Sequence, residues 1–120
     1  MDFKQALNDI CLRVSGGIAS SLMGFDGIPV ETVQLEASGM DINTLLVEYT
    51  NIFQQVCRSA EVIDSGQVRE MVIRTDAFSI ILRRVTEEYF LALMIKPEGN
   101  LGQGRYGLRV FSPQFEQELI

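Results

Sequence analysis

The stretch of this chain that most closely matches a known ligand-binding pattern is Gly102-Gln103-Gly104-Arg105-Tyr106-Gly107. Their G-x-G-x-x-G spacing, after a strand and at the start of a helix, is typical of a turn that holds the pyrophosphate of a dinucleotide. Such a site also needs a second parallel strand and an acidic ribose ligand about 20 residues further on. The stretch after this motif, to Ile120, is too short for either, so we expect no nucleotide cofactor. In the structural interpretation, Gly99 and Gly102 shape a loop, and Gly104 and Gly107 let a helix approach a sheet closely.

Other residue types that support catalysis are scarce. The chain has no His, which excludes nucleophile activation of the Ser-His and Cys-His kinds. A zinc site would need carboxylates together with Cys11 and Cys57, which lie far apart in the sequence. Glu87 and Glu88 fall in an expected hairpin turn, where solvated side chains are far commoner than an acid/base pair. We therefore assign no catalytic residue and no metal site, and we expect that the protein is not an enzyme.

Composition limits the class of protein further. A chain of 120 residues fits one domain, spanning residues 1–120, that buries roughly two thirds of its unfolded surface. Its net charge of -6, from 16 acidic and 10 basic residues, argues against a nucleic-acid surface, which needs clustered Lys and Arg.

The two cysteines and the N-terminus bear on the compartment. Cys11 and Cys57 both fall on apolar helix stripes, which favours buried thiols in a reducing compartment over a disulfide or a redox pair. No stretch reaches the roughly 18 continuous apolar residues of a membrane span, and residues 1–4 do not open a secretory signal. We expect a cytoplasmic protein.

Strand character is found in three segments close together in the sequence: residues 68–75, 77–85 and 89–96. In the last two segments, both the odd and the even positions carry apolar side chains. Because successive strand residues point to opposite faces, such strands need cover above and below the sheet. The connections are too short for a crossover helix, so the strands must pair antiparallel. The third of the five expected strands, residues 68–75, is less apolar and could form an edge.

The remaining segments supply two more strands and the helices. Apolar spacing predicts a short helix over residues 3–14, and strands over 18–23 and 28–35 flank the turn Gly24-Phe25-Asp26-Gly27. Pro29 lacks an amide donor and places the second of these strands at an edge. A last helix follows residues 97–104, with an interruption or kink at Pro113 before Ile120.

A long helix is predicted over residues 42–63, with Asp41 or Asn43 as its N-cap. The apolar stripe expected to face the sheet comprises Ile42, Leu45, Leu46, Tyr49, Ile52, Phe53, Val56, Cys57, Ala60 and Ile63. The fold class is therefore α+β, an α/β/α sandwich with element order αββαβββα. One long helix covers one face of a five-stranded antiparallel sheet, and two terminal helices cover the other.

This order, together with three local motifs, resembles the Roadblock (dynein light chain) family, especially its bacterial MglB-type branch, over essentially the whole chain. The motifs are the Gly-Phe-Asp-Gly-Ile-Pro-Val hairpin, the long helix after Gly39-Met40-Asp41, and Leu101-Gly102 opening a last helix that carries Leu108-Arg109-Val110. The resemblance implies a homodimer in which the third strands pair antiparallel and the long helices lie side by side. It also implies that the helical face binds a Ras-like small GTPase and modulates its GTP hydrolysis by repositioning the GTPase's own residues. The alternative is a structural adaptor, like the dynein light-chain branch, without effect on nucleotide turnover.

Two sets of interaction residues follow from this interpretation. The dimer interface is expected to comprise Val68, Glu70, Met71, Val72, Ile73 and Arg74. The partner-binding surface is expected on the weakly charged outer side of the long helix, at Thr44, Val47, Asn51, Gln54, Gln55, Arg58 and Val62. Arg83 and Arg84 point to opposite faces of their strand, so at least one should snorkel or pair with a carboxylate. The alternative role for one of them is an arginine finger for the GTPase.

Overall fold

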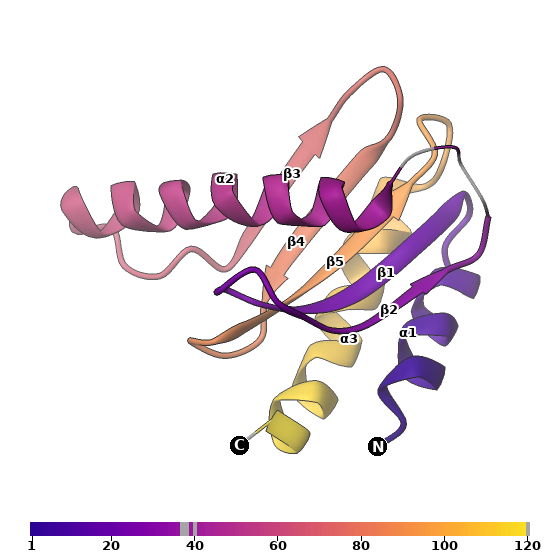
Figure 1. Ribbon diagram of the computed structural model, residues 1–120, viewed down its shortest axis with the longest axis horizontal. Coiled ribbons are helices and arrows are strands. Elements are labelled where there is room, and N and C mark those ends of the chain that lie inside the picture. The colour runs from indigo at the N-terminus through magenta and orange to yellow at the C-terminus, as the bar shows by residue number, and fades with distance from the viewer. Residues whose placement is uncertain (37–38, 40, 120) are drawn as a thin grey trace.

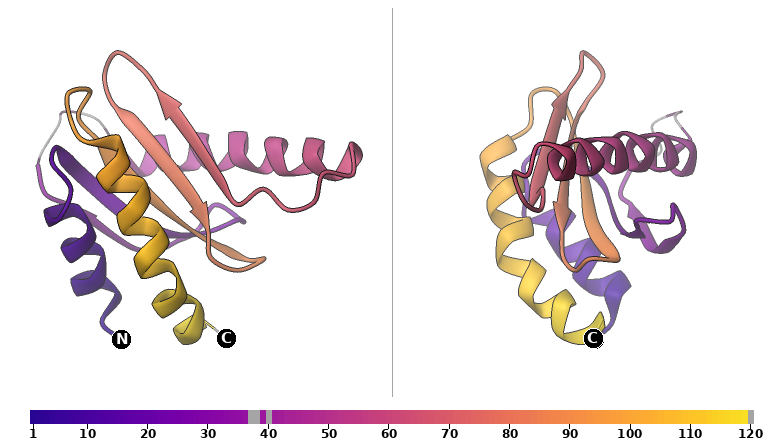
Figure 2. Two further views of the ribbon diagram at one scale, coloured as in Figure 1. Left: turned by 180° about the vertical axis from the view of Figure 1, so that it is seen from behind. Right: turned by 90° about the vertical axis from the view of Figure 1, so that its left-hand side faces the viewer.

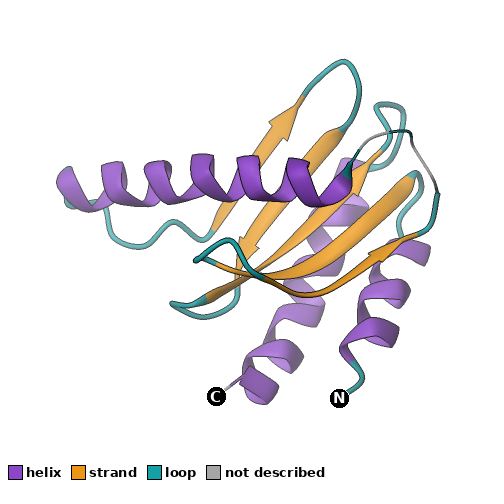
Figure 3. Cartoon of the chain, in the orientation of Figure 1, coloured by secondary structure: helices purple, strands orange, loops and turns teal. Residues whose placement is uncertain are grey.

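The computed structural model describes residues 1–36, 39 and 41–119 of the chain. Eight elements follow one another in the order predicted from the sequence (Figures 1 and 3). They are α1 (Phe3–Leu12), β1 (Gly17–Gly24), β2 (Pro29–Gln34), α2 (Ile42–Val62), β3 (Glu70–Arg74), β4 (Ser79–Arg84), β5 (Tyr89–Ile95) and α3 (Leu101–Leu119). Met40, in the turn expected before the long helix, and Ile120 lie outside the described residues.

The five strands form one antiparallel sheet in the order β2-β1-β5-β4-β3. The two-sided apolar strands β4 and β5 lie inside the sheet, because both of their faces are buried. Both edge predictions are confirmed, since β2 carries Pro29 at one edge and β3 forms the other. The edge strand β3 begins at Glu70 rather than at Val68, because the Val68 carbonyl accepts a hydrogen bond from the Arg84 side chain instead.

The helices cover the two faces of the sheet as expected, α2 on one and α1 with α3 on the other (Figure 2). The α1/α3 face is filled by Leu7, Ile10, Leu108 and Phe115 against side chains such as Ile81. On the α2 face, Leu46 and Phe53 pack against Ile80, Leu82 and Phe90. The predicted α/β/α sandwich is therefore confirmed, and each face has its own hydrophobic core.

Helix ends follow the residues that can cap them. The Asp41 carboxylate accepts hydrogen bonds from the N–H groups of Asn43 and Thr44, so Asp41 rather than Asn43 is the N-cap of α2.

Helix α3 is not interrupted at Pro113, which is exposed within the helix. No helix in the described part of the chain is both long and apolar enough to span a membrane.

Candidate interaction site

The outer edge of β3 presents free backbone groups. The Arg84 N–H donates to the Arg69 carbonyl at 2.9 Å, and the Thr75 N–H donates to the Phe78 carbonyl at 2.8 Å. Since hydrogen-bonded positions alternate along an antiparallel pair, residues 69, 71, 73 and 75 face β4. The N–H and C=O groups of Glu70, Val72 and Arg74 therefore point away from the sheet, where a further strand could pair with them.

The side chains of β3 alternate between the two faces of the sheet. Met71 and Ile73 pack, half-buried, on the α2 side, together with Val68 from the preceding loop. Val72 packs on the α1/α3 side, where Glu70 also meets Arg105 of α3. Arg74 is exposed at the end of the strand. The structure thus brings the six expected dimer residues together at one edge, and the backbone of that edge is unpaired within the described chain.

The sheet-facing stripe of α2 is narrower than the sequence predicted. Ile52, Val56 and Ile63 are 41%, 38% and 74% exposed, so their assignment to the buried stripe was wrong. Thr50 is buried instead, and its hydroxyl donates to the Leu46 carbonyl at 2.6 Å. At about 100° per residue the apolar positions cover a wide arc, and only one side of that arc contacts the sheet.

The remaining apolar positions form a strip along one side of α2, which we call the apolar flank: Leu45, Tyr49, Ile52, Val56 and Ile63. Tyr49 makes an edge-on contact with Phe78, with ring centroids 6.0 Å apart, at the turn that joins β3 to β4. This contact places the flank on the side of α2 that faces the free edge. In Figure 1 the C-terminal end of α2 extends past the strands. An apolar strip and an unpaired strand edge therefore lie on the same side of the molecule.

The opposite side of α2 carries the residues expected to bind a partner, which we call the outer face. Thr44, Val47, Asn51, Gln55, Arg58 and Val62 are all exposed. Gln54 is the exception, because its side-chain amide donates to the Phe25 carbonyl in the β1–β2 turn and is half-buried. Gln54 therefore ties α2 to that hairpin, and its expected role in partner binding stays a prediction.

The start of α2 is held by a charged cap. Besides its two backbone bonds, Asp41 accepts a hydrogen bond from the Thr44 hydroxyl at 2.7 Å. The side-chain and backbone hydrogen bonds from Thr44 lower the pKa of the Asp41 carboxyl below its ordinary value. The negative charge also complements the positive end of the helix dipole.

The two strand arginines have different surroundings, and neither is free on the α2 face. Arg84 lies over the Phe25 ring, 4.5 Å from its centroid, and its Nε donates to the Val68 carbonyl at 3.0 Å. Its Nη atoms donate to the carbonyls of Thr86 and Glu87 and to Cys57 Sγ. Arg83 lies on the opposite face of the sheet, beside Glu70. The donors of Arg84 are thus used in hydrogen bonds within the chain, and Arg83 lies on the face of the sheet opposite α2. Neither arginine is therefore placed to act as an arginine finger at the α2 surface.

The glycine motif opens helix α3. An added Cβ on Gly104 would lie 2.6 Å from Ile95 Cδ1 and 2.8 Å from Ile81 Cδ1, which confirms the close approach of helix and sheet there. Gly107 has no such neighbour within 4 Å, and Gly102 lies inside the helix rather than in a loop, so these two assignments were wrong. Among the described residues, no group of three or more His, Cys, Asp or Glu is placed to hold a metal ion.

No family model matches the sequence, and no curated protein matches it either. Solved structures do. MglC from Myxococcus xanthus is 39% identical, with 98% of this chain and 99% of that chain covered and a TM-score of 0.71. A Roadblock/LC7 domain from Streptomyces avermitilis is 15% identical, with 99% and 98% covered and a TM-score of 0.86. The gliding protein MglB from Thermus thermophilus is 15% identical, with 94% and 84% covered and a TM-score of 0.82. The first match establishes common descent along the whole chain, and the others share the fold, so the chain belongs to the Roadblock/LC7 family, together with MglC.

Proposed function

We propose that the protein is a homodimeric, non-enzymatic regulator that binds a Ras-like small GTPase and modulates its GTP hydrolysis. The observation that carries the proposal is the unpaired edge of β3 beside the apolar flank of α2, in a chain with the Roadblock/LC7 fold. The functional unit is one domain spanning residues 1–120. We place it in the cytoplasm, where a small GTPase is found and where Cys11 and Cys57 stay as free thiols.

A dimer formed through β3 is the first part of the proposed function. A second copy that adds its β3 to the free edge would continue the sheet through the outward N–H and C=O groups of Glu70, Val72 and Arg74. The same two-fold axis would bring the two apolar flanks toward each other and cover Ile52 and Val56. Backbone pairing and apolar burial thus favour the same arrangement.

Charge selects the register of that pairing. If Val72 lies opposite Val72 of the second copy, Glu70 lies opposite Arg74 of that copy, twice by symmetry. A shift that centres the axis on Glu70 or on Arg74 would place that residue opposite its own copy. Like charges directly opposite each other destabilise a strand pair. Shifts that centre it on Met71 or Ile73 lose both opposite-charge pairs. We therefore propose the register centred on Val72.

The outer face of α2 is the proposed GTPase surface. Val47 and Val62 are 43% and 86% exposed and provide apolar contact, while Asn51, Gln55 and Arg58 provide hydrogen bonds around it. Two copies side by side approach the roughly 800 Å² per partner of a standard interface. Because one asymmetric GTPase cannot use a two-fold patch twice, we expect two protomers for each GTPase.

A structural adaptor without effect on hydrolysis is the second candidate. One observation favours it over direct stimulation. Arg84 is occupied by backbone carbonyls, so any stimulation would rely on repositioning the GTPase's own residues.

The experiment that tests the proposal measures GTP hydrolysis by a Ras-like GTPase from the same genome, with and without the protein. Asn51→Arg should abolish binding, because it buries a surplus charge at the partner surface. Gln114→Arg makes the same charge change on α3 and should have no effect. A change in hydrolysis that Asn51→Arg removes supports the regulator, and binding without a change in hydrolysis supports the adaptor. Binding that survives Asn51→Arg and Gln55→Arg together would refute the surface.

A further inference from the structure

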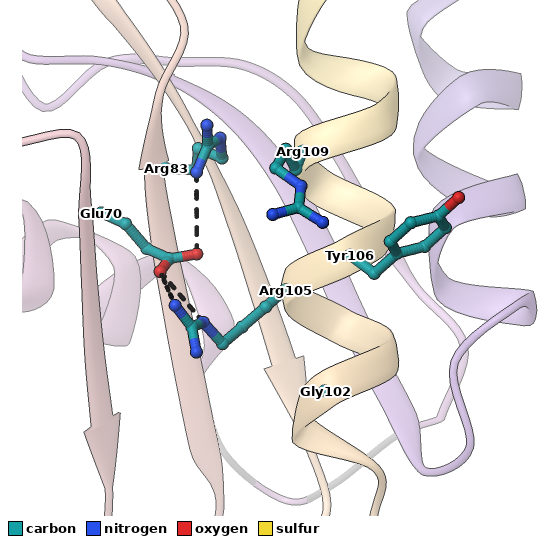
Figure 4. Close-up of a pocket in the computed structure, with 6 residues that line it drawn as sticks. All are labelled: Glu70, Arg83, Gly102, Arg105, Tyr106 and Arg109. Carbon is teal, nitrogen blue, oxygen red and sulfur yellow. Dashed lines mark hydrogen bonds and ion pairs between the residues drawn. The ribbon is translucent and has the colours of Figure 1, made fainter.

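A polar pocket lies between α3 and the strands β3 and β4, on the face of the sheet opposite α2 (Figure 4). Its cavity has a volume of about 200 Å³ and is lined by Glu70, Arg83, Gly102, Arg105, Tyr106 and Arg109. Three of the ten basic residues of the chain therefore gather here around one carboxylate. In a protein with a net charge of -6, this pocket carries a local surplus of two positive charges.

One carboxylate is shared between two of the guanidinium groups. Glu70 Oε2 accepts hydrogen bonds from Arg105 Nε at 3.0 Å and from Arg105 Nη2 at 2.8 Å. Glu70 Oε1 lies 3.8 Å from Arg83 Nη1. The carboxylate therefore satisfies Arg105 well and Arg83 only loosely. Arg83 Nε is buried and has no hydrogen-bond partner among the described residues.

Arg109 is the third guanidinium, one turn along α3 from Arg105. Its Cζ lies 5.7 Å from the centre of the Tyr106 ring, and no carboxylate pairs with it in the described part of the chain. In Figure 4 its guanidinium points into the space between α3 and Arg83. The donors of Arg109 are thus available to a ligand that enters this space.

The pocket has an exposed rim and a more buried base. The side chain of Arg105 is 57% exposed, whereas those of Arg83 and Glu70 are 23% and 16% exposed. Arg105 and Arg109 therefore form the mouth of the pocket, and Glu70 and Arg83 form its base. Gly102 on the near turn of α3 has no side chain to close the mouth.

We propose that this pocket binds a carboxylate side chain from an acidic segment of a protein partner. A guanidinium presents several N–H donors suited to a carboxylate, and Arg105 already donates from Nε and Nη2 to one oxygen of Glu70. A second carboxylate between Arg105 and Arg109 would reduce the surplus from two positive charges to one. Because the chain is acidic overall, much of its surface would repel an acidic segment, and the electrostatic field would steer that segment to this basic pocket.

This site is independent of the proposed GTPase surface, since the sheet separates α3 from α2 (Figure 2). Loss of binding at the pocket should therefore leave binding at the α2 surface intact, and the reverse should also hold. Binding of an acidic segment could link the dimer to a second protein while the α2 side remains occupied. The inference stands whether or not the partner at α2 is a GTPase.

The test uses fluorescence anisotropy with a labelled octaglutamate peptide, and with octaglutamine as the uncharged probe. Arg105→Gln and Arg109→Gln are each expected to weaken octaglutamate binding about tenfold, because each removes a charge-assisted contact. Arg58→Gln on α2 removes the same charge from the far side of the sheet and should leave affinity unchanged. Thermal unfolding of each variant shows whether it is folded.

The outcomes separate the proposal from its alternatives. Octaglutamate binding that both α3 variants weaken and Arg58→Gln does not would support it. Equal loss in all three variants would reveal a diffuse charge effect and overturn it. Inorganic phosphate that binds this pocket when octaglutamate does not would also overturn it, in favour of a phosphate site. Absence of octaglutamate binding to the wild-type protein would leave the arginines as a structural ion-pair cluster and refute the inference.

Discussion

At the residue scale, single side chains decide how tightly the helices fit the sheet. Gly104 is buried against Ile81 and Ile95, whereas Gly107, in the same helix, faces open space. These two glycines of α3 thus have different surroundings, although they are the same residue type. The difference depends on which side of α3 meets the sheet.

Substitutions at these two glycines should affect the free energy of unfolding differently. Gly104→Val would force a side chain into the core and should lower the free energy of unfolding by about 1–3 kcal/mol. Gly107→Ala should be neutral or raise it by up to about 1 kcal/mol, since Ala favours helix and meets no neighbour. Chemical denaturation of both variants measures the two changes. Equal destabilisation by both would contradict the assignment of the contact to Gly104.

The Asp41 cap predicts a pH dependence. Its pKa is lower in the folded protein than in the unfolded chain, so its contribution is present above the unfolded value of about 3.9 and is lost as pH falls through the folded value. Asp41→Ala should therefore lower the melting temperature at neutral pH and make little difference at strongly acidic pH. Asp41→Asn keeps a capping side chain without the charge. At neutral pH its melting temperature should lie between those of the wild type and Asp41→Ala. A constant difference between wild type and Asp41→Ala across this range would contradict the role of the carboxylate.

At the element scale, the sequence predicted what depends on local periodicity. Two-sided apolar strands required helices on both faces, and Pro29 and the charged third strand indicated the two edges. Periodicity could not tell where the sheet ends beneath α2, so Ile52, Val56 and Ile63 were assigned to the core although they are exposed. Nor could it pair Glu70 with Arg105, since that contact depends on the crossing of α3 over β3 and β4.

The free edge of β3 gives a selective way to test the proposed dimer. The Val72 N–H points away from β4, so Val72→Pro should abolish pairing with a second copy while the monomer stays folded. Val72→Ala keeps the N–H and should remain dimeric. Light scattering gives the mass, and circular dichroism reports the fold. A Val72→Pro protein that is still dimeric would show that β3 is not the interface.

The proposed register predicts which charge matters. Arg74→Glu would oppose Glu70 of the second copy at two symmetric positions and should weaken the dimer about tenfold. Arg69→Glu makes the same change one residue before β3, where the register places no Glu opposite, and should have a smaller effect. Sedimentation at a series of concentrations yields both dissociation constants. The same loss from both variants would argue for overall charge rather than register.

At the scale of the whole molecule, the sheet separates two surfaces with different chemistry. The α2 side combines the apolar flank with the weakly charged outer face, and the α3 side carries the arginine pocket. A dimer would display each surface twice around one axis. This arrangement suits a protein that holds a partner on one side while it is linked to another protein on the opposite side.

The most direct test of the central claim is the mass of the complex with a Ras-like GTPase in its GTP state, measured by light scattering after gel filtration. We predict two copies of this protein for each GTPase, and an intact dimer without bound GTPase for Asn51→Arg. A wild-type protein that is monomeric, or a dimer that forms no complex with any Ras-like GTPase of the same genome, would contradict the account.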